Sequence, residues 1–461
     1  MKPTSVRLRE ARVGRGWSQP RLVRELRQTA TRRGHQLPSD SSVKRRIASW
    51  ENGHSIPDSF YGPLLCDAYG VNAGELGLNH SEPKDAAVVD AAYPASPDDA
   101  IQTIGQLWRA DLNQYDPLLT SEPSEPAWSE ASLRWLVAPE PSTPRPRDGG
   151  VRVGLGDVAA VRTTADVFAR LDDQFGGDHA RHSVIQYLNN DVAPLLRGRY
   201  TEQVGRALFS TVAEATLLAG WMSYDSCRHG LAQRYFLQAL RLAQDANDRR
   251  LAGSILSAMS HQATFLGRYT QAATLARAAL MGISPVATPT LRAQFHAMEA
   301  RALARTGDVI GCEAALSAAS KALESRNSED EPEWISYFDE IELAAEAAHC
   351  FRDVNSARRA VAHAENAMSG SHVRSDFFAT MVLADAHMRA GEVEEACRVA
   401  LDALDLGEQL KSARCVSYLA EFRHNLRARR PSAAARRLAE EGQDHRLWIA
   451  AGTFSQGSAS G

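Results

Sequence analysis

The chain has 461 residues, of which 44% are hydrophobic and 23% charged. This length suits two or three domains, and the composition is that of an ordinary globular protein. No apolar run reaches the roughly 18 residues of a membrane span, and no apolar stretch follows the first charged residues as in a secretory signal, so we expect a cytoplasmic protein without membrane contact. The six cysteines contain no Cys-x-x-Cys pair, which predicts reduced thiols, no metal site and no cofactor.

Charge is spread unevenly along the chain. Residues 1–50 hold thirteen Lys and Arg against Glu10, Glu25 and Asp40, a net charge of +10, so the remaining residues carry −14. A basic end on an acidic body is typical of a protein that binds a polyanion with one end. A basic surface without a partner is the alternative.

Residues 1–78 read as a series of short helices. Ser18 and Gln19 stand where one of them begins, and a serine there can cap the first free N–H groups. The motifs Leu8-Arg9, "GRGWSQPRL" (14–22), "IASWENG" (47–53), Pro57 and "LLCDAYGVNAGEL" (64–76) follow in the order found in the lambda-repressor-like, or XRE-type, helix-turn-helix family, which this part of the chain resembles. The resemblance implies a helical bundle that binds double-stranded DNA as a homodimer.

The spacing of two motifs departs from that family. Ile47, Glu51 and Gly53 match the recognition helix, but 29 positions separate Ser18 from Ile47, more than the family has. The insertion "RQTATRRGHQLPSD" (27–40) must lengthen the second helix or the turn after it. We expect its Arg32 and Arg33 to contact a phosphate. Pro63 is a second departure, since it stands where the fourth helix would continue.

The stretch "SSVKRRIASWENG" (41–53) is the expected recognition helix. On a helical wheel Val43, Ile47 and Trp50 share one face, Arg45 lies opposite, and Lys44 and Arg46 lie at the sides. Because an arginine fork can bond guanine O6 and N7 together, we expect Arg45 to read a base and its neighbours to face phosphates. The resemblance also implies base contacts by Lys44 and Ser49. The other predicted DNA contacts are Gln19, Ser41, Ser42 and Asn52.

Residues 79–150 read as a linker. Seven prolines lie between Pro117 and Pro146, among many acidic residues, and such a segment does not sustain long helices. Two short helices are expected within it, at 98–115 and around 128–137. The second carries Trp128, Leu133, Trp135 and Leu136, which suit packing on a neighbour.

From residue 151 to 430 the pattern is helical, rich in Ala and Leu, and repetitive. With Cys227, Gly267, Gly307, Arg352 and Gly391 as anchors, the spacings are 40, 40, 45 and 39. Small residues recur seven positions before each anchor and five and twelve after it, where they let helices approach closely. This arrangement resembles tetratricopeptide repeats and implies an α-solenoid of five helical hairpins. Residues 431–461 are expected to form a capping helix and a disordered tail.

In such repeats the first helix of each hairpin lines a concave groove. The residues expected there have mixed charge and suit a peptide, a polar small molecule or a protein effector. They are Trp221, Tyr224, Ser257, His261, Arg301, Glu342, Glu346, His349, Asp385 and Met388. Ordinary solvent-exposed positions are the alternative.

The sequence therefore predicts an all-α protein with an N-terminal helix-turn-helix bundle (1–78), a proline-rich linker (79–150), a tetratricopeptide-like solenoid (151–430) and a C-terminal cap and tail (431–461). The combination resembles a branch of actinobacterial regulators. We expect a sequence-specific transcriptional regulator, cytoplasmic and associated with the nucleoid when it binds DNA. We expect no enzyme, because the sequence contains no catalytic motif. The alternative is a protein-interaction scaffold whose helix-turn-helix is a docking module.

Overall fold

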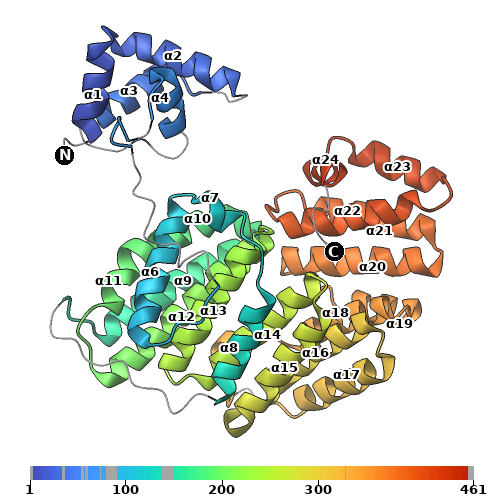
Figure 1. Cartoon of the computed structure of the whole chain (residues 1–461). Helices are drawn as coiled ribbons and strands as arrows, with labels where there is room; N and C mark the ends of the chain where they lie inside the picture. The colour runs from blue at the N-terminus through green and yellow to red at the C-terminus, as the bar shows by residue number, and fades with distance from the viewer. Residues whose placement is uncertain are drawn as a thin grey trace. The chain divides into compact units, whose positions relative to one another are not determined.

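The computed structural model describes residues 4–33, 37–52, 57, 61–72, 74–78, 91–137, 150–327 and 329–454. Every regular element among them is helical, apart from an isolated bridge between Arg152 and Arg199, so the predicted all-α class is confirmed (Figure 1). The chain divides into two compact units, residues 1–87 with 110–115 and residues 88–109 with 116–461. We call them the head and the body.

Four helices of the head carry its core: α1 (Thr4–Gly14), α2 (Gln19–Arg32), α3 (Asp40–Glu51) and α4 (Tyr61–Tyr69). Helix α2 begins as predicted, since the Ser18 hydroxyl accepts a hydrogen bond from the Arg21 N–H at 3.3 Å. Pro63 falls in the first turn of α4, where its missing N–H leaves no helical bond unmade. Gly53 and residues 58–60, where the helix expected after Pro57 would continue, lie outside the described residues.

The insertion in the head is divided between α2, which runs for 14 residues, and the connection to α3. Arg27 of α2 contacts the described end of that connection, next to α3. Its guanidinium lies 2.6 Å from the Asp40 carboxylate at the start of α3 and donates to the Pro38 carbonyl at 2.8 Å. Leu22 and Leu26 of α2 are fully buried against the head's core, so the longer helix still packs along its first turns.

The segment expected as a linker contains three helices, α6 (Pro97–Leu112), α7 (Asp116–Leu119) and α8 (Glu125–Val137). Its prolines do not prevent helix formation, because Pro97, Pro117 and Pro126 are the first or second residues of these helices. Two parts of that linker, 79–90 and 138–149, lie outside the described residues.

Residues 116–137 pack against the first two hairpins of the body. Ser124 exchanges two backbone hydrogen bonds of 2.7 Å with the Gln233 side chain. Trp128 and Trp135 of α8 are buried, as the sequence suggested, and the Trp135 ring rests against the backbone of Gly282. Leu133, by contrast, is 61% exposed.

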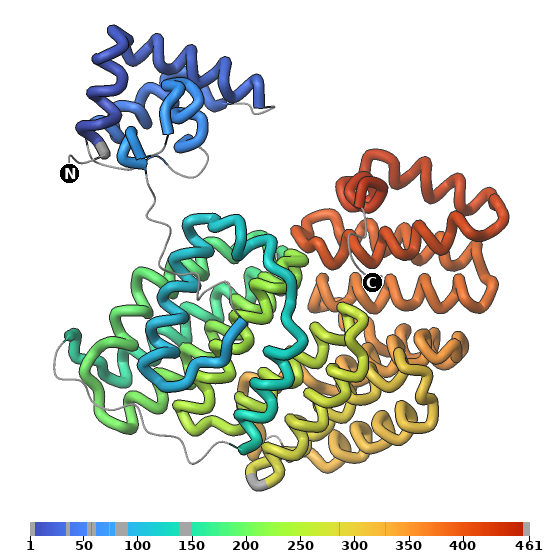
Figure 2. The backbone as a smooth tube through the Cα atoms, in the orientation of Figure 1, coloured from blue at the N-terminus to red at the C-terminus, as the bar shows by residue number. Residues whose placement is uncertain are grey.

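The body is an array of helical hairpins that follow one another in chain order (Figure 2). Helices α9 (Leu155–Phe175) and α10 (Gly177–Tyr187), the π-helical turn η1 (Leu188–Val192) and α11 (Ala193–Leu196) precede it. The five hairpins are α12 (Glu202–Asp225) with α13 (His229–Asp245), α14 (Arg249–Phe265) with α15 (Tyr269–Ile283), α16 (Pro289–Thr306) with α17 (Val309–Glu324), α18 (Glu340–Asp353) with α19 (Ala357–Glu365), and α20 (Val373–Ala390) with α21 (Val393–Leu406). Helices α22 (Ala413–Arg427), α23 (Ala433–Gly442) and α24 (Arg446–Thr453) follow; residues 455–461 of the predicted tail lie outside the described residues.

The turn of the fourth hairpin corrects the predicted repeat register. Cys227, Gly267, Gly307 and Gly391 lie in their turns with positive φ, but the fourth turn residue is Asn355, at φ 59°. The predicted anchor Arg352 lies inside α18 and is buried. Asparagine tolerates the left-handed conformation that otherwise favours glycine.

With Asn355 as the anchor, the spacings become 40, 40, 48 and 36. The small residues of the fourth hairpin are then Ala348, Ala360 and Ala367, at most 3% exposed. The same three positions are buried in every other hairpin. The columns of small residues therefore mark close helix packing, as the sequence predicted, in a register three residues later at this one repeat.

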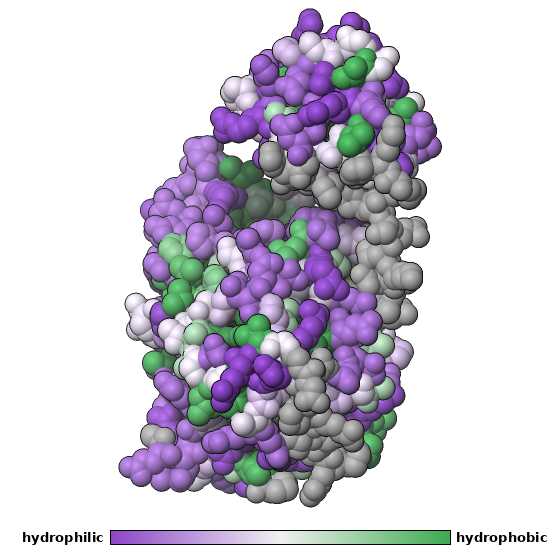
Figure 3. All heavy atoms as spheres, turned by 90° about the vertical axis from the view of Figure 1, so that its left-hand side faces the viewer, coloured by the Kyte–Doolittle hydropathy of each residue, from purple (hydrophilic) through white to green (hydrophobic). Residues whose placement is uncertain are grey.

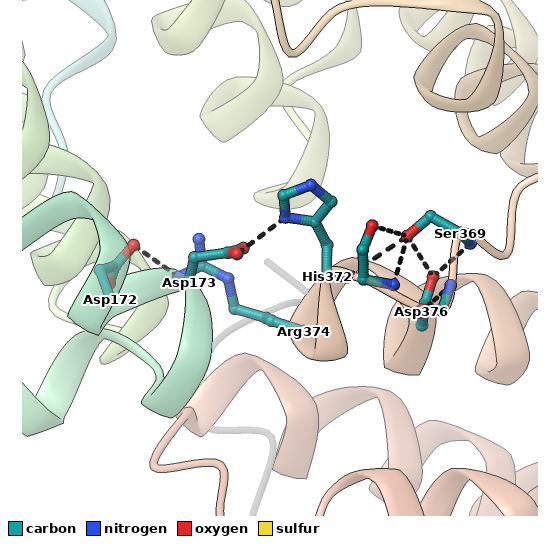
Figure 4. Close-up of polar contacts among 8 residues, drawn as sticks. Asp172, Asp173, Ser369, His372, Arg374 and Asp376 are labelled. Carbon is teal, nitrogen blue, oxygen red and sulfur yellow. Dashed lines mark hydrogen bonds and ion pairs between the residues drawn. The ribbon is translucent and has the colours of Figure 1, made fainter. Parts of the chain in front are cut away.

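Helix α9, which precedes the five hairpins, contacts the first helix of the fifth hairpin. Asp172 near the end of α9 pairs with Arg374 of α20 at 2.7 Å, and Asp173 lies 2.8 Å from Nδ1 of His372 (Figure 4). The Lys411 N–H, before α22, donates to the Phe175 carbonyl at 2.6 Å. We call Asp172, Asp173, His372 and Arg374 the end contact; it joins residues about two hundred positions apart.

The face drawn in Figure 3 is mostly hydrophilic, with hydrophobic residues in small scattered groups. No helix in the part of the chain that the structure describes is long and apolar enough to cross a membrane.

Candidate nucleic-acid interface and hairpin interior

Helix α3 has one buried and one exposed face. Val43, Ile47 and Trp50 are at most 4% exposed, which confirms the predicted stripe. Lys44 and Arg45 are exposed and form no hydrogen bond or ion pair with other described residues. Arg46 is also exposed, and its guanidinium lies over the Tyr61 ring at 5.3 Å. Within the described part of the head, two of the three basic side chains therefore have no polar partner, and the third lies against an aromatic ring of α4.

The C-terminal end of α3 is fixed by Glu51, which is 6% exposed. Its carboxylate accepts two bonds from Arg12 of α1, at 2.6 and 2.8 Å, and one from Nε2 of Gln19 at 3.1 Å. The hydrogen bond to Glu51 raises the pKa of the Arg12 guanidinium above its ordinary value. Asn52 accepts from Arg9 at 2.6 Å. Gln19 and Asn52, expected at DNA, thus hold α3 against α1 and α2.

The other predicted DNA contacts fall into two groups. Arg33 pairs with Asp67 of α4 at 2.6 Å, and Arg32 donates to the Thr29 hydroxyl at 3.2 Å, so both insertion arginines have partners within the head. On α3, Ser41 is exposed with its hydroxyl 3.0 Å from that of Ser39, and Ser42 and Ser49 are half-buried. Ser41, Lys44 and Arg45 therefore share the open side of α3, whereas Arg33 points to α4.

The ten predicted groove residues all lie on first helices of the hairpins, from α12 to α20. Several contact one another. The Tyr224 hydroxyl lies 3.1 Å from Nδ1 of His261, and Trp221 packs edge-on against His261 with ring centroids 5.6 Å apart. Arg301 forms an ion pair with Glu346 of the next hairpin.

Helix α22 lies against this inner surface, a contact that the sequence did not predict. The Arg414 guanidinium is 4.5 Å from the centre of the Tyr224 ring and 4.5 Å from that of Phe378. Tyr418, one turn later, packs against Phe378 and His349 with ring centroids 4.9 and 5.9 Å apart. An arginine and an aromatic residue four positions apart on one helix were the only sequence signal. Part of the expected open groove is thus filled by the chain itself.

Burial changes the charge of the inner surface. It lowers the pKa of His261 and His349 well below the ordinary value, so both imidazoles are neutral at pH 7. Burial raises the pKa of Glu342 to about 8 and that of Asp385 to about 7. Among the described residues, Nε of Arg301, Nδ1 of His349 and Oδ1 of Asp385 are buried without a hydrogen-bond partner. Three polar atoms of the inner surface therefore lack a hydrogen-bond partner among the described residues.

Ser257 and Met388, the remaining groove residues, are 2% exposed, so they serve packing and present little surface. No group of three His, Cys, Asp or Glu suited to a metal ion occurs within the described ranges. Comparison of the chain with family models, with curated proteins and with solved structures gives no match.

Proposed function

We propose that the chain is a sequence-specific DNA-binding transcriptional regulator, with an XRE-type helix-turn-helix head and a tetratricopeptide-like body that binds an effector or mediates dimerisation. The observation that supports this most is α3. Its apolar stripe is buried, and its exposed side presents Lys44 and Arg45, which form no hydrogen bond or ion pair with other described residues, within a segment of net charge +10.

In this proposal the head recognises DNA with α3. Arg45 bonds a guanine edge in the major groove, while Lys44 and Arg46 contact the phosphates on either side. The Arg12–Glu51–Gln19 network supports this, because it fixes the end of α3 through three hydrogen bonds and so holds the reading side chains in one orientation.

The body then takes the effector on its inner surface. Unused polar atoms of Arg301, His349 and Asp385, which come from three successive first helices, support a polar ligand there. Such a ligand regulates DNA binding only if it binds two arrangements of the body with different affinity.

Selection of duplexes from a randomised pool at physiological salt, with the full chain, tests the proposal. We expect one sequence to be enriched. Arg45→Ala should lower the affinity for that sequence by about tenfold or more and relax the preference at one base pair, whereas Lys44→Ala should weaken all duplexes alike and reduce the salt dependence. Arg358→Ala, an exposed arginine on α19, is the matched control and should change nothing.

If the wild-type chain enriches no sequence, the proposal is wrong and the head is better described as a protein-docking module. If enrichment occurs but is unchanged in Arg45→Ala, then the assignment of Arg45 is wrong and the regulator remains. Circular dichroism of each variant shows whether a loss comes from unfolding.

A further inference from the structure

Helix α17 lies apart from the fourth hairpin, although α16 of the same hairpin packs closely on α18. The connection from α17 to α18 runs over residues 325–339, whereas α13 and α14 are joined by residues 246–248 alone. As a result α17 contacts α18 far less than α13 contacts α14 or α15 contacts α16. The long spacing from Gly307 to Asn355 in the sequence thus has a structural counterpart, a cleft of about 440 Å³ between α17 and the fourth hairpin.

The floor of this cleft is apolar. It consists of side chains from facing stripes of two helices, Leu316 and Leu323 on α17 and Leu343, Ala347 and Phe351 on α18. A volume of about 440 Å³ lies within the range of small-molecule sites, roughly 300–1,000 Å³, which are mostly apolar with a few charged groups.

The rim of the cleft is acidic. Glu313, Glu324 and Glu340 line it, against one arginine, Arg359. Arg359 is not free to bind an anion, because it pairs with Glu313 and lies 3.7 Å from the centre of the Phe351 ring.

Two further groups affect the charge near the rim. Arg326 partly neutralises Glu340 at 3.0 Å. Burial lowers the pKa of His363, which leaves that imidazole uncharged. Glu324 is exposed and has no hydrogen bond or ion pair with any described residue, so it is the carboxylate left for a ligand.

We propose that this cleft binds a small amphipathic amine. Its apolar part lies on the apolar floor of the cleft, and its ammonium group lies beside Glu324. The site is separate from the inner surface assigned to the effector, and binding here does not depend on DNA recognition by the head.

A fluorescent pair of probes tests the inference on the full chain. Dansylcadaverine carries an apolar bicycle and an ammonium, and dansyl-6-aminohexanoate carries the same bicycle and a carboxylate. We expect dansylcadaverine to bind saturably with a rise in emission, and at least tenfold more tightly than the anion at low salt. Glu324→Gln should reduce that preference several-fold, while Glu440→Gln, an exposed acid on α23, should leave it unchanged.

Filling the cleft provides the second arm. Ser320 is exposed on α17 and lines the cleft, so Ser320→Trp should abolish binding of dansylcadaverine without disturbing the core. Ala314 is exposed on the same helix but does not line the cleft, and Ala314→Trp should bind as the wild type does. No saturable binding, equal affinity for the two probes, or full binding by Ser320→Trp would each overturn the inference.

Discussion

Replacing Arg374 with methionine should destabilise the body, because it leaves Asp172 at the end contact without its cation. The two side chains pair at 2.7 Å, and Asp172 is 3% exposed. Removing one partner of a buried pair costs about 3–5 kcal/mol. The Arg374 side chain retains 21% exposure, which lets water reach the site and places the expected loss at the lower end of that range.

The loss should depend on pH. Burial raises the pKa of Asp172 above its ordinary value, although Arg374 opposes this. A carboxyl whose pKa is higher in the folded than in the unfolded state makes the fold less stable as pH rises between the two values. Without Arg374 the folded-state pKa rises further, so Arg374→Met should lose more stability at pH 8 than at pH 5, where Asp172 can be protonated.

Urea unfolding of the full chain, followed by circular dichroism at both pH values, measures the effect, and hydrogen exchange in α9 and α20 shows whether the loosening is local. Arg398→Met is the matched control, since Arg398 pairs with Glu395 at the surface with 58% and 42% of the side chains exposed, and it should cost less than about 1 kcal/mol. A loss in Arg374→Met no greater than in this control, or equal at both pH values, would refute the reasoning.

Three further predictions concern the interior and the head. Glu342→Gln should remove a fall in stability between pH 5 and pH 8, measured as the urea midpoint. Burial raises the pKa of Glu342 to about 8, so over this range the unfolded wild type releases a proton that the folded chain retains, and stability falls as pH rises. Glu51→Ala should destabilise the head by about 3 kcal/mol, seen as a lower melting temperature in calorimetry, because it leaves the largely buried Arg12 without its carboxylate. Gly282→Val should displace α8, since a Cβ at this position would overlap the Trp135 ring, and tryptophan emission should shift to longer wavelength; unchanged emission would contradict that packing.

Local sequence patterns predicted those features that depend on neighbouring residues. The burial of Val43, Ile47 and Trp50 follows from the helical period, and the Ser18 cap from one side chain and the next turn. The small-residue columns were predicted, but the fourth anchor was wrong. Ala345, Ala357 and Ala364 give the same pattern around Arg352 as Ala348, Ala360 and Ala367 give around Asn355, the residue with positive φ. The positive φ of the turn residue is what repeats from hairpin to hairpin, and the type of residue there varies.

Features that depend on distant residues were not predicted. Nothing near Arg414 indicates that its guanidinium meets Tyr224, almost two hundred positions earlier. The many prolines of residues 79–150 predicted a segment without long helices. Their positions matter more than their number, because Pro97, Pro117 and Pro126 lie in the first turns of helices. The acidic rim of the cleft was not predicted either. It depends on the long spacing from Gly307 to Asn355, which was underestimated when Arg352 was taken as the anchor.

The end contact gives the hairpin array a mechanical property that open arrays lack. In an open array each hairpin touches only its neighbours, and a change at one interface moves everything beyond it without resistance. Here Asp172 and Arg374 join helices that flank the first four hairpins, so these hairpins form a closed ring. The angles between successive hairpins must then add up to a fixed total. A ligand that widens one interface therefore has to narrow others or break the ring at the end contact, which converts a local event into a response of the whole body.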